Sequence, residues 1–205
     1  MKPEDLDTQL IANSRWLHTT GITCAISTSA AATAAAGLEI ARKAGIKKSF
    51  DLNIRRKLWS EEQARKVLEP IARDVDLLIG GEDEYCAIFG TSDPQEALRI
   101  AASRNNELVI MTHGPEQLTY AVAGEITVVH PPQVKSVDPV GSGDAFTSGV
   151  ISGLLGGLTF SDAISQGTIS GARVASQFGD WAGLPSGKSG ITDQSFIDEI
   201  LGKAS

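Results

Sequence analysis

The sequence predicts an α/β fold with a largely parallel central sheet. Short apolar segments with the length of buried strands alternate along the chain with segments of helical length. Turn and cap signals separate them, including a capping box at Ser60–Gln63 and a proline at the first helical position after Asp93. With 205 residues and neither repeats nor low-complexity tracts, residues 1–205 are expected to form a single α/β domain.

Each element follows from local signals. The first helix, 3–13, has Pro3 in its first turn, and an Ala-rich helix ends at Gly45, which is a typical C-terminal cap. Pro70 weakens or kinks the later half of the helix that Ser60 opens. After the first helix, helices are expected at 28–44 (the Ala-rich helix), 60–74 (the helix that Ser60 opens), 82–89, from 93 onward, 143–156, 161–177 and 193–201. Strands are expected at 15–21, 48–52, 76–79 and 108–112, with a hairpin of 118–122 and 126–129.

Composition excludes several classes of protein. The net charge is −7 and no basic block occurs, which argues against nucleic acid as the partner. No apolar stretch reaches membrane-spanning length, and the acidic amphipathic start is not a signal peptide. Two cysteines without CxxC spacing, Cys24 and Cys86, indicate reduced thiols, so a cytoplasmic protein is expected. The scattered residues His18, His113 and His130 favour structural roles over a metal site.

The run from Asp138 to Phe146 reads Asp-Pro-Val-Gly-Ser-Gly-Asp-Ala-Phe and places a glycine-rich loop directly before an apolar helical segment. Backbone N–H groups at a helix start lack intrahelical partners, and glycine lets an anion approach them closely. An aspartate beside such a nest can accept a proton from a hydroxyl that attacks a bound phosphate. The candidate catalytic residues are Gly141, Ser142, Gly143 and Asp144. The alternative is a tight turn in which Asp144 only stabilises the helix dipole.

The loop after the second strand carries an acceptor, an amide and a guanidinium at alternate positions: Asp51, Asn53 and Arg55. If the segment stays extended, these side chains share a face, and the guanidinium is suited to bind a carboxylate in bidentate fashion. The alternative is a solvated strand end with Arg55 in a weak surface ion pair. Because ligands of such sheets bind at the carboxyl ends of strands, the loops after the strands are expected to share one rim with residues 141–144.

Two more rim loops carry candidates. Three acids open the helix after the third strand, and there they either stabilise the helix dipole or, through Glu84, hold magnesium-bound water near phosphates. Thr112 and Gly114, after the strand at 108–112, are candidates for contact with nucleotide phosphates or ribose. By contrast, Gly187–Ser189 imitates the end of a Walker A loop without its first glycine or a preceding strand, and a surface loop is expected there.

With these motifs, the chain resembles the ribokinase-like (PfkB) carbohydrate kinases, and among them most the 2-keto-3-deoxygluconate kinases. The family signature Asp-Thr-x-Gly-Ala-Gly-Asp-Ala-Phe is matched by Asp138–Phe146. The subgroup is matched by Asp51-x-Asn53-x-Arg55 with Leu58-Trp59, and by the segments 16–22 and 179–185. The resemblance spans nearly the whole chain and implies a three-layer α/β/α fold with a largely parallel central sheet.

The resemblance also implies roles for the candidates. Asp144 would be the catalytic base, and Gly141, Ser142 and Gly143 would form an anion hole for the moving phosphoryl group. Arg55 would bind the sugar-acid carboxylate in a pocket shaped by Asp51 and Asn53. The nucleotide site would be lined by Thr112, Gly114, Gly141, Gly143, Ala172 and Ser176. ATP and Mg²⁺ are implied, with K⁺ or another monovalent ion sometimes present near the signature loop of such enzymes, and homo-oligomerisation is left open.

Two features depart from the family pattern. The family often has Asn-x-x-Glu after the third strand; here Gly81 stands at the Asn position, while Glu84 is kept. The chain also matches only the C-terminal two-thirds of such a kinase, so the opening strands, an early Gly-rich sugar motif and the β lid are expected to be absent. That absence is expected to expose a sheet edge and to leave the sugar half-enclosed.

The expected function is ATP-dependent phosphorylation of a sugar acid, 2-keto-3-deoxygluconate or a close relative, at a primary hydroxyl. The alternative is a catalytically inactive nucleotide-binding fragment of such a kinase. A Rossmann-type methyltransferase or dehydrogenase is not favoured, because its Gly-x-Gly would follow the first strand and here the glycine nest lies at 141–143.

Overall fold

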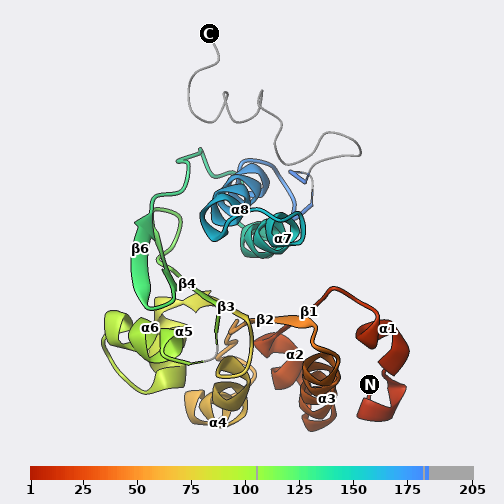
Figure 1. Cartoon of the computed structure of the whole chain (residues 1–205). Helices are drawn as coiled ribbons and strands as arrows, with labels where there is room; N and C mark the ends of the chain where they lie inside the picture. The colour runs from red at the N-terminus through yellow and green to blue at the C-terminus, as the bar shows by residue number, and fades with distance from the viewer. Residues whose placement is uncertain (105, 182, 185–205) are drawn as a thin grey trace. The chain divides into compact units, whose positions relative to one another are not determined.

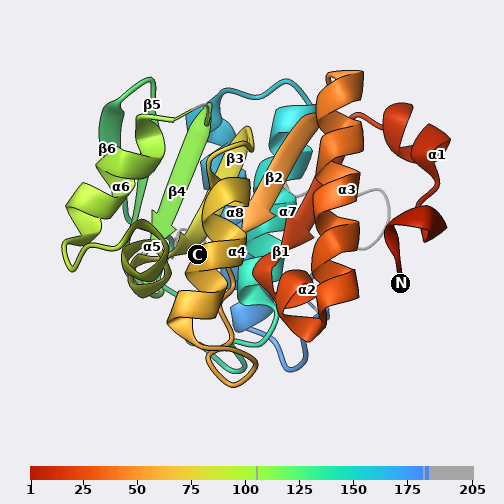
Figure 2. The same ribbon diagram turned by 90° about the horizontal axis from the view of Figure 1, so that it is seen from below.

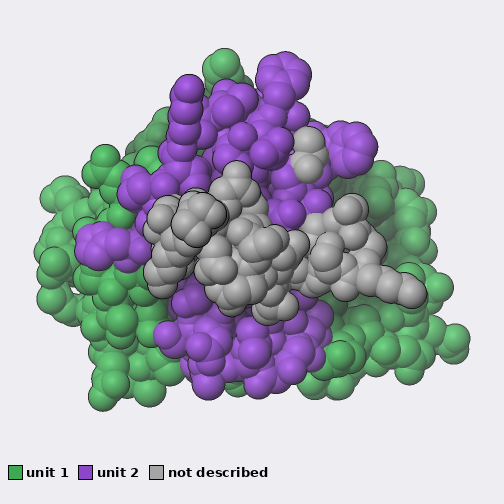
Figure 3. Space-filling model, turned by 90° about the horizontal axis from the view of Figure 1, so that it is seen from above, with its two compact units in different colours: residues 1–129 green, residues 130–205 purple. Residues whose placement is uncertain are grey.

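The computed structural model describes residues 1–104, 106–181 and 183–184. The helix expected at 193–201 and the loop at Gly187–Ser189 lie outside the described residues. The chain divides into two compact units, 1–129 and 130–205, which Figure 3 distinguishes by colour. That residues 1–205 form one domain stays a prediction. No helix among the described residues is long and apolar enough to cross a membrane.

Unit 1 contains a six-stranded sheet whose spatial order follows the chain. Its first four strands are parallel, and the last two form an antiparallel hairpin, as the sequence predicts. β1 and β6 are the edge strands, each with one neighbour. The strands are β1 (Trp16–Thr20), β2 (Lys47–Asp51), β3 (Leu77–Gly81), β4 (Leu108–Thr112), β5 (Leu118–Val122) and β6 (Glu125–Val129).

Most helices of unit 1 gather on one face of this sheet (Figures 1 and 2), where they enclose the hydrophobic core. Phe50, Leu78, Val109 and Met111 point into that core from successive strands. The helical elements are η1 (Pro3–Asp5), α1 (Thr8–Ala12), α2 (Gly21–Ile26), α3 (Thr28–Ala44), α4 (Glu61–Ala72), α5 (Glu82–Phe89) and α6 (Pro94–Ala102).

The predicted caps are confirmed. Ser60 Oγ accepts from the Gln63 N–H at 3.2 Å, and Gln63 Oε1 accepts from the Ser60 N–H at 3.0 Å. Gly45 ends α3 at φ +70°, a left-handed conformation that favours glycine. Pro70 lies inside α4 without ending it.

The sequence-based prediction is wrong at two places near the N-terminus. The single helix expected at 3–13 is two short helices, because Leu6 is extended and Asp7 caps a new helix by accepting from the Leu10 N–H at 2.9 Å. The helix α2, which begins directly at Gly21, was expected to be a loop. It is short, and no side chain caps it, so it gives no recognisable start signal.

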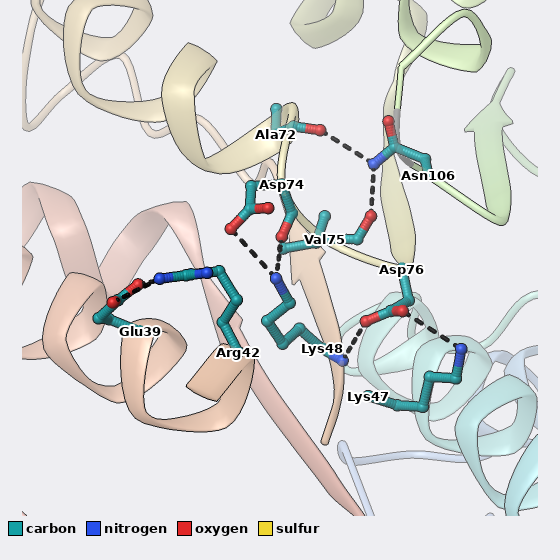
Figure 4. Close-up of polar contacts among 9 residues, drawn as sticks. All are labelled: Glu39, Arg42, Lys47, Lys48, Ala72, Asp74, Val75, Asp76 and Asn106. Atoms are coloured by element: carbon teal, nitrogen blue, oxygen red, sulfur yellow. Dashed lines mark hydrogen bonds and ion pairs between the residues drawn. The ribbon is translucent and has the colours of Figure 1, made fainter. Parts of the chain in front are cut away.

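The amino ends of β2 and β3 are joined by a polar network around Asp76 (Figure 4). The Asp76 carboxylate accepts from the Lys48 backbone N–H at 2.7 Å and from Lys47 Nζ at 3.3 Å. Lys47 also pairs with Glu107, and the buried Lys48 ammonium pairs with Asp74 at 3.1 Å. This network stabilises the sheet at the amino ends of its parallel strands, opposite their carboxyl ends.

The described residues of unit 2 include two helices, α7 (Ser142–Leu155) and α8 (Phe160–Ala175), which match the helices expected at 143–156 and 161–177 to within two residues. They pack closely through glycines. A Cβ added at Gly149 would lie 2.7 Å from Ser170 Oγ, and one added at Gly167 would lie 2.6 Å from Val150 Cγ2. Larger residues at these positions would push the helices apart.

Candidate functional site

The carboxyl ends of β1 to β4 form a polar rim in unit 1. In the parallel register, Thr20 pairs with Asp51, and Gly81 pairs with Thr112. The loops that follow these strands therefore start from one edge of the sheet, as expected. That this rim and residues 141–144 share one site stays a prediction, since residues 141–144 belong to unit 2.

The loop after β2 does not stay extended as the alternating pattern required. Asn53 adopts φ +34°, a conformation that asparagine tolerates better than most residues, and its N–H donates to Asp51 Oδ1 at 3.2 Å. The apolar residues between the candidates, Leu52 and Ile54, are buried. Asp51 and Asn53 are half-buried and Arg55 is exposed, so the three polar candidates still alternate with core residues.

The two neighbouring arginines of this loop differ in their partners. Arg56 pairs with Glu61 at 2.7 Å and with Asp83 at 2.8 Å. Arg55 makes no salt bridge with any residue that the structure describes. Among the described residues the surface ion pairs of this loop are therefore made by Arg56, whereas the exposed Arg55 interacts electrostatically with the Glu84 carboxylate. Binding of a carboxylate ligand by Arg55 stays a prediction.

Glu84, in the first turn of α5, joins two rim loops. Its Oε2 accepts from the Gly81 N–H at 2.8 Å, and its Oε1 accepts from the Ile54 N–H at 2.6 Å. Burial raises the pKa of this carboxyl, although the two backbone donors act in the opposite direction. Among the described residues no group of three or more His, Cys, Asp or Glu side chains could hold a metal ion. Glu84 thus has a structural role here, and its role toward magnesium stays a prediction.

The end of β4 carries the remaining candidates of unit 1. The Thr112 hydroxyl donates to the Gly80 carbonyl at 3.3 Å, which ties β4 to β3 at the rim. Gly114 adopts φ +71° and is exposed, and the turn closes through a 2.9 Å bond from the His113 N–H to the Gln117 carbonyl. Thr112 and Gly114 therefore lie on a fixed turn at the rim.

Unit 2 presents the glycine nest at the start of α7. Gly141 caps the helix at φ +79°, and the Ser142 hydroxyl donates to the Pro139 carbonyl at 2.8 Å. The backbone N–H groups of Gly143 and Asp144 have no acceptor among the described residues. A Cβ added at Gly143 would meet no described residue within 4 Å. The geometry fits an anion such as a phosphate.

The Asp144 carboxylate is exposed at this helix start and forms no hydrogen bond or salt bridge within the described part of the chain. The loop in front of it is held in place. Asp138 accepts from the Val140 N–H at 3.0 Å and from the Gly179 N–H at 3.3 Å. On this loop, the Asp144 carboxylate and the amides of Gly143 and Asp144 lie together without a partner among the described residues. That Asp144 acts as a general base stays a prediction.

The last two nucleotide candidates lie on α8 and at its end. Ala172 is buried, and Ser176 caps the helix, with its hydroxyl donating to the Arg173 carbonyl at 2.8 Å. A Cβ added at Gly171 would lie 3.0 Å from the Ser142 carbonyl oxygen, so this part of α8 packs against the nest. Contact of Ala172 or Ser176 with a nucleotide stays a prediction.

Comparison with known proteins gives a family for this geometry. A sequence model of the pfkB family carbohydrate kinases matches residues 1–186. The chain is 31% identical over 185 residues to a 2-dehydro-3-deoxygalactonokinase of Haloferax volcanii, covering 88% of this chain and 58% of that protein. It is 33% identical over 156 residues to a fructokinase of Klebsiella pneumoniae, covering 75% and 50%. The chain thus spans about half the length of the curated relatives it matches.

Solved structures agree. A 2-dehydro-3-deoxygluconokinase from Thermotoga maritima is 25% identical with a TM-score of 0.82, covering 98% of this chain and 64% of that one. A ribokinase-like structure from E. coli in complex with ATP and Mg²⁺ is 23% identical with a TM-score of 0.86, covering 97% and 63%. These matches confirm the ribokinase-like α/β fold.

Proposed function

The chain belongs to the pfkB family of carbohydrate kinases, and on that premise we propose that it transfers the γ-phosphoryl group of ATP to a primary hydroxyl of a sugar acid. The proposed acceptor is 2-keto-3-deoxygluconate or a close relative. Several relatives named for 2-dehydro-3-deoxy sugar acid kinases, at about 30% identity, support this class of acceptor.

The single observation that carries the proposal is the exposed Asp144 carboxylate beside the amides of Gly143 and Asp144, none of which has a partner in the described part of the chain. The amides and the positive end of the α7 dipole would bind the charge on the phosphoryl group, with Gly141 and Ser142 shaping the loop. The carboxylate would accept the proton of the attacking hydroxyl while the hydroxyl oxygen forms the new bond to the γ-phosphorus. The bond from that phosphorus to the bridging β,γ-oxygen would break, and ADP would leave.

For the nucleotide, we propose contacts from Thr112, Gly114, Ala172 and Ser176. Magnesium usually binds through phosphate oxygens and water with few protein carboxylates, so the lack of a ligand cluster among the described residues fits a metal carried by ATP. When bound, Mg²⁺ neutralises charge on the phosphates; Glu84 would contact it through water. No residue is assigned to a monovalent cation such as K⁺, and its concentration is varied in the assay.

For the acceptor, we propose that Arg55 binds the carboxylate and that Asp51 and Asn53 contact hydroxyl groups. The exposed Arg55, without a salt bridge among the described residues, supports this choice. A neutral sugar would not use this guanidinium. The fructokinase among the relatives makes fructose the competing acceptor, and preference for an acidic over a neutral sugar separates the two.

The test is an assay of the purified 205-residue chain with ATP, Mg²⁺ and either 2-keto-3-deoxygluconate or fructose. ADP release and the mass of the product are measured, and ATP binding is followed by calorimetry. A phosphorylated sugar acid is the expected result. ATP binding without any product would overturn the proposal in favour of a catalytically inactive nucleotide-binding fragment, the reading that the shorter length relative to the curated relatives favours.

A further inference from the structure

The imidazole ring of His113 joins three elements of unit 1. Its Nδ1 lies 2.7 Å from Glu82 Oε2 on α5, and its Nε2 lies 3.0 Å from Thr119 Oγ1 on β5. His113 itself directly follows β4. We call these three side chains the His113 bridge. The sequence assigned the histidine only a general structural role, and neither the rim nor the nest described above uses it.

The bridge lies on the helix-covered face of the sheet. Residues two positions apart in a strand point to the same face of the sheet. His113 therefore lies on the same face as Met111, and Thr119 on the same face as Ala121; Met111 and Ala121 both belong to the hydrophobic core. The Thr112 hydroxyl, on the opposite side of the strand, bonds to Gly80. The short turn after β4 is therefore held from both faces of the sheet.

We propose that the His113 bridge is a positioning element, which fixes the turn at Thr112–Gly114 and thereby sets the affinity for the nucleotide. This inference rests on the proposed function, because that function assigns Thr112 and Gly114 to the nucleotide site. Gly114 is exposed at φ +71°, and among the described contacts the bonds of its neighbours Thr112 and His113 hold the turn. A turn that is already ordered loses less conformational entropy when a ligand binds.

The two arms of the bridge are unequal. The Thr119 side is buried, with the residue 8% exposed, whereas the Glu82 side chain is 52% exposed. A buried hydroxyl that loses its partner is costly, while an exposed ion pair contributes little. The bond to Thr119 is therefore expected to do most of the positioning. At position 113, asparagine places its amide near the position of Nδ1 and can keep the contact with Glu82, whereas glutamine places its amide near the position of Nε2 and can keep the contact with Thr119.

The experiment compares H113L, H113N and H113Q with the wild-type chain. The matched control is H18L, because His18 also bonds through its ring, to Ser49 Oγ at 2.8 Å, but lies on β1 away from this turn. The first readout is amide hydrogen exchange in residues 112–117, which needs no ligand. The second is the Kd for ATP by calorimetry, with kcat and both KM values where turnover is measurable.

We expect H113L to speed amide exchange at the turn and to raise the Kd for ATP about tenfold, with kcat changed less than about twofold. H113Q should restore most of the affinity, H113N little of it, and H18L should leave both readouts at wild-type values. Unchanged exchange in H113L, or equal effects of H18L, would overturn the inference. A third outcome is faster exchange in H113L together with no ATP binding by the wild-type chain. It would show that the His113 bridge orders the turn, but it would refute the proposed function and, with it, the role of the bridge in nucleotide affinity.

Discussion

Glu84 Oε1 accepts a 2.6 Å hydrogen bond from the backbone N–H of Ile54, so the first turn of α5 holds the loop that follows β2. The same carboxylate caps its own helix through Gly81. The loop carries Asn53 and Arg55 on either side of Ile54. Glu84, which the sequence suggested for metal binding, therefore positions the two residues that are proposed to bind the sugar acid. This contact joins two rim loops that are 30 residues apart in sequence.

The first prediction concerns the pH dependence of stability. Burial raises the pKa of Glu84 above its unfolded value, so protonated Glu84 favours the folded state. Its contribution to stability is fully present below the unfolded pKa and is lost as pH rises through the folded pKa. In E84Q this loss is absent. We expect the free energy of unfolding of E84Q, relative to wild type, to increase as pH rises above the unfolded value of 4.5, measured by urea denaturation. A difference that is constant with pH would contradict the account.

Two glycines provide a second prediction, with opposite outcomes for the same substitution. A Cβ at Gly21 would lie 2.0 Å from the Leu52 carbonyl oxygen, so G21A should lower the free energy of unfolding by about 3 kcal/mol. At Gly143 a Cβ meets nothing within 4 Å, and G143A should leave stability unchanged or slightly higher.

The methyl group of G143A would nevertheless add bulk at the glycine nest, next to amides that have no acceptor among the described residues. We expect kcat/KM for ATP to fall at least about tenfold in this well-folded variant. Wild-type activity in G143A would show that no phosphate binds against these amides.

The third prediction separates the neighbouring arginines. R55A should raise the KM for 2-keto-3-deoxygluconate at least about tenfold, because a bidentate carboxylate contact is lost, and should leave the KM for a neutral sugar nearly unchanged. R56A is the matched control, since it removes the same side chain from a residue paired with Glu61 and Asp83. Equal effects of R55A and R56A in steady-state assays would argue against a carboxylate site at Arg55.

A fourth prediction concerns the polar network around Asp76, at the amino ends of β2 and β3. D76A leaves the Lys48 backbone N–H without its acceptor, so the free energy of unfolding should fall by about 1–3 kcal/mol. E107A removes only a half-exposed partner of Lys47 and should cost less than about 1 kcal/mol. Thermal or urea unfolding measures both. Similar losses in the two variants would show that the backbone contact of Asp76 is not the important one.

Much of the fold follows from local sequence signals. The capping box at Ser60, the C-cap at Gly45 and the proline after Asp93 each fix a helix end within a few residues, and the structure confirms them. Where such a signal is weak the prediction is wrong, as at α2, which has no side-chain cap, and at Leu6, whose extended backbone divides the first helix.

The candidate site shows the same limit. The Gly141–Asp144 nest is predicted from a contiguous motif; Gly141 caps α7 at φ +79°, and Asp144 is exposed, while the catalytic role of these residues stays a prediction. The contacts Glu84–Ile54 and Glu82–His113 join residues about 30 positions apart, and no local pattern indicates them. The alternation of buried and polar residues around Leu52 and Ile54 is visible in the sequence, but the positive φ of Asn53 (+34°) is not.

The most direct test of the account is the turnover of D144N beside its affinity for ATP. Asparagine keeps the size of the side chain but cannot accept the hydroxyl proton, so kcat should fall by about 10²–10⁴-fold while the Kd for ATP stays within about threefold of wild type. Product formation by D144N at close to the wild-type rate would contradict the central claim that this carboxylate is the base.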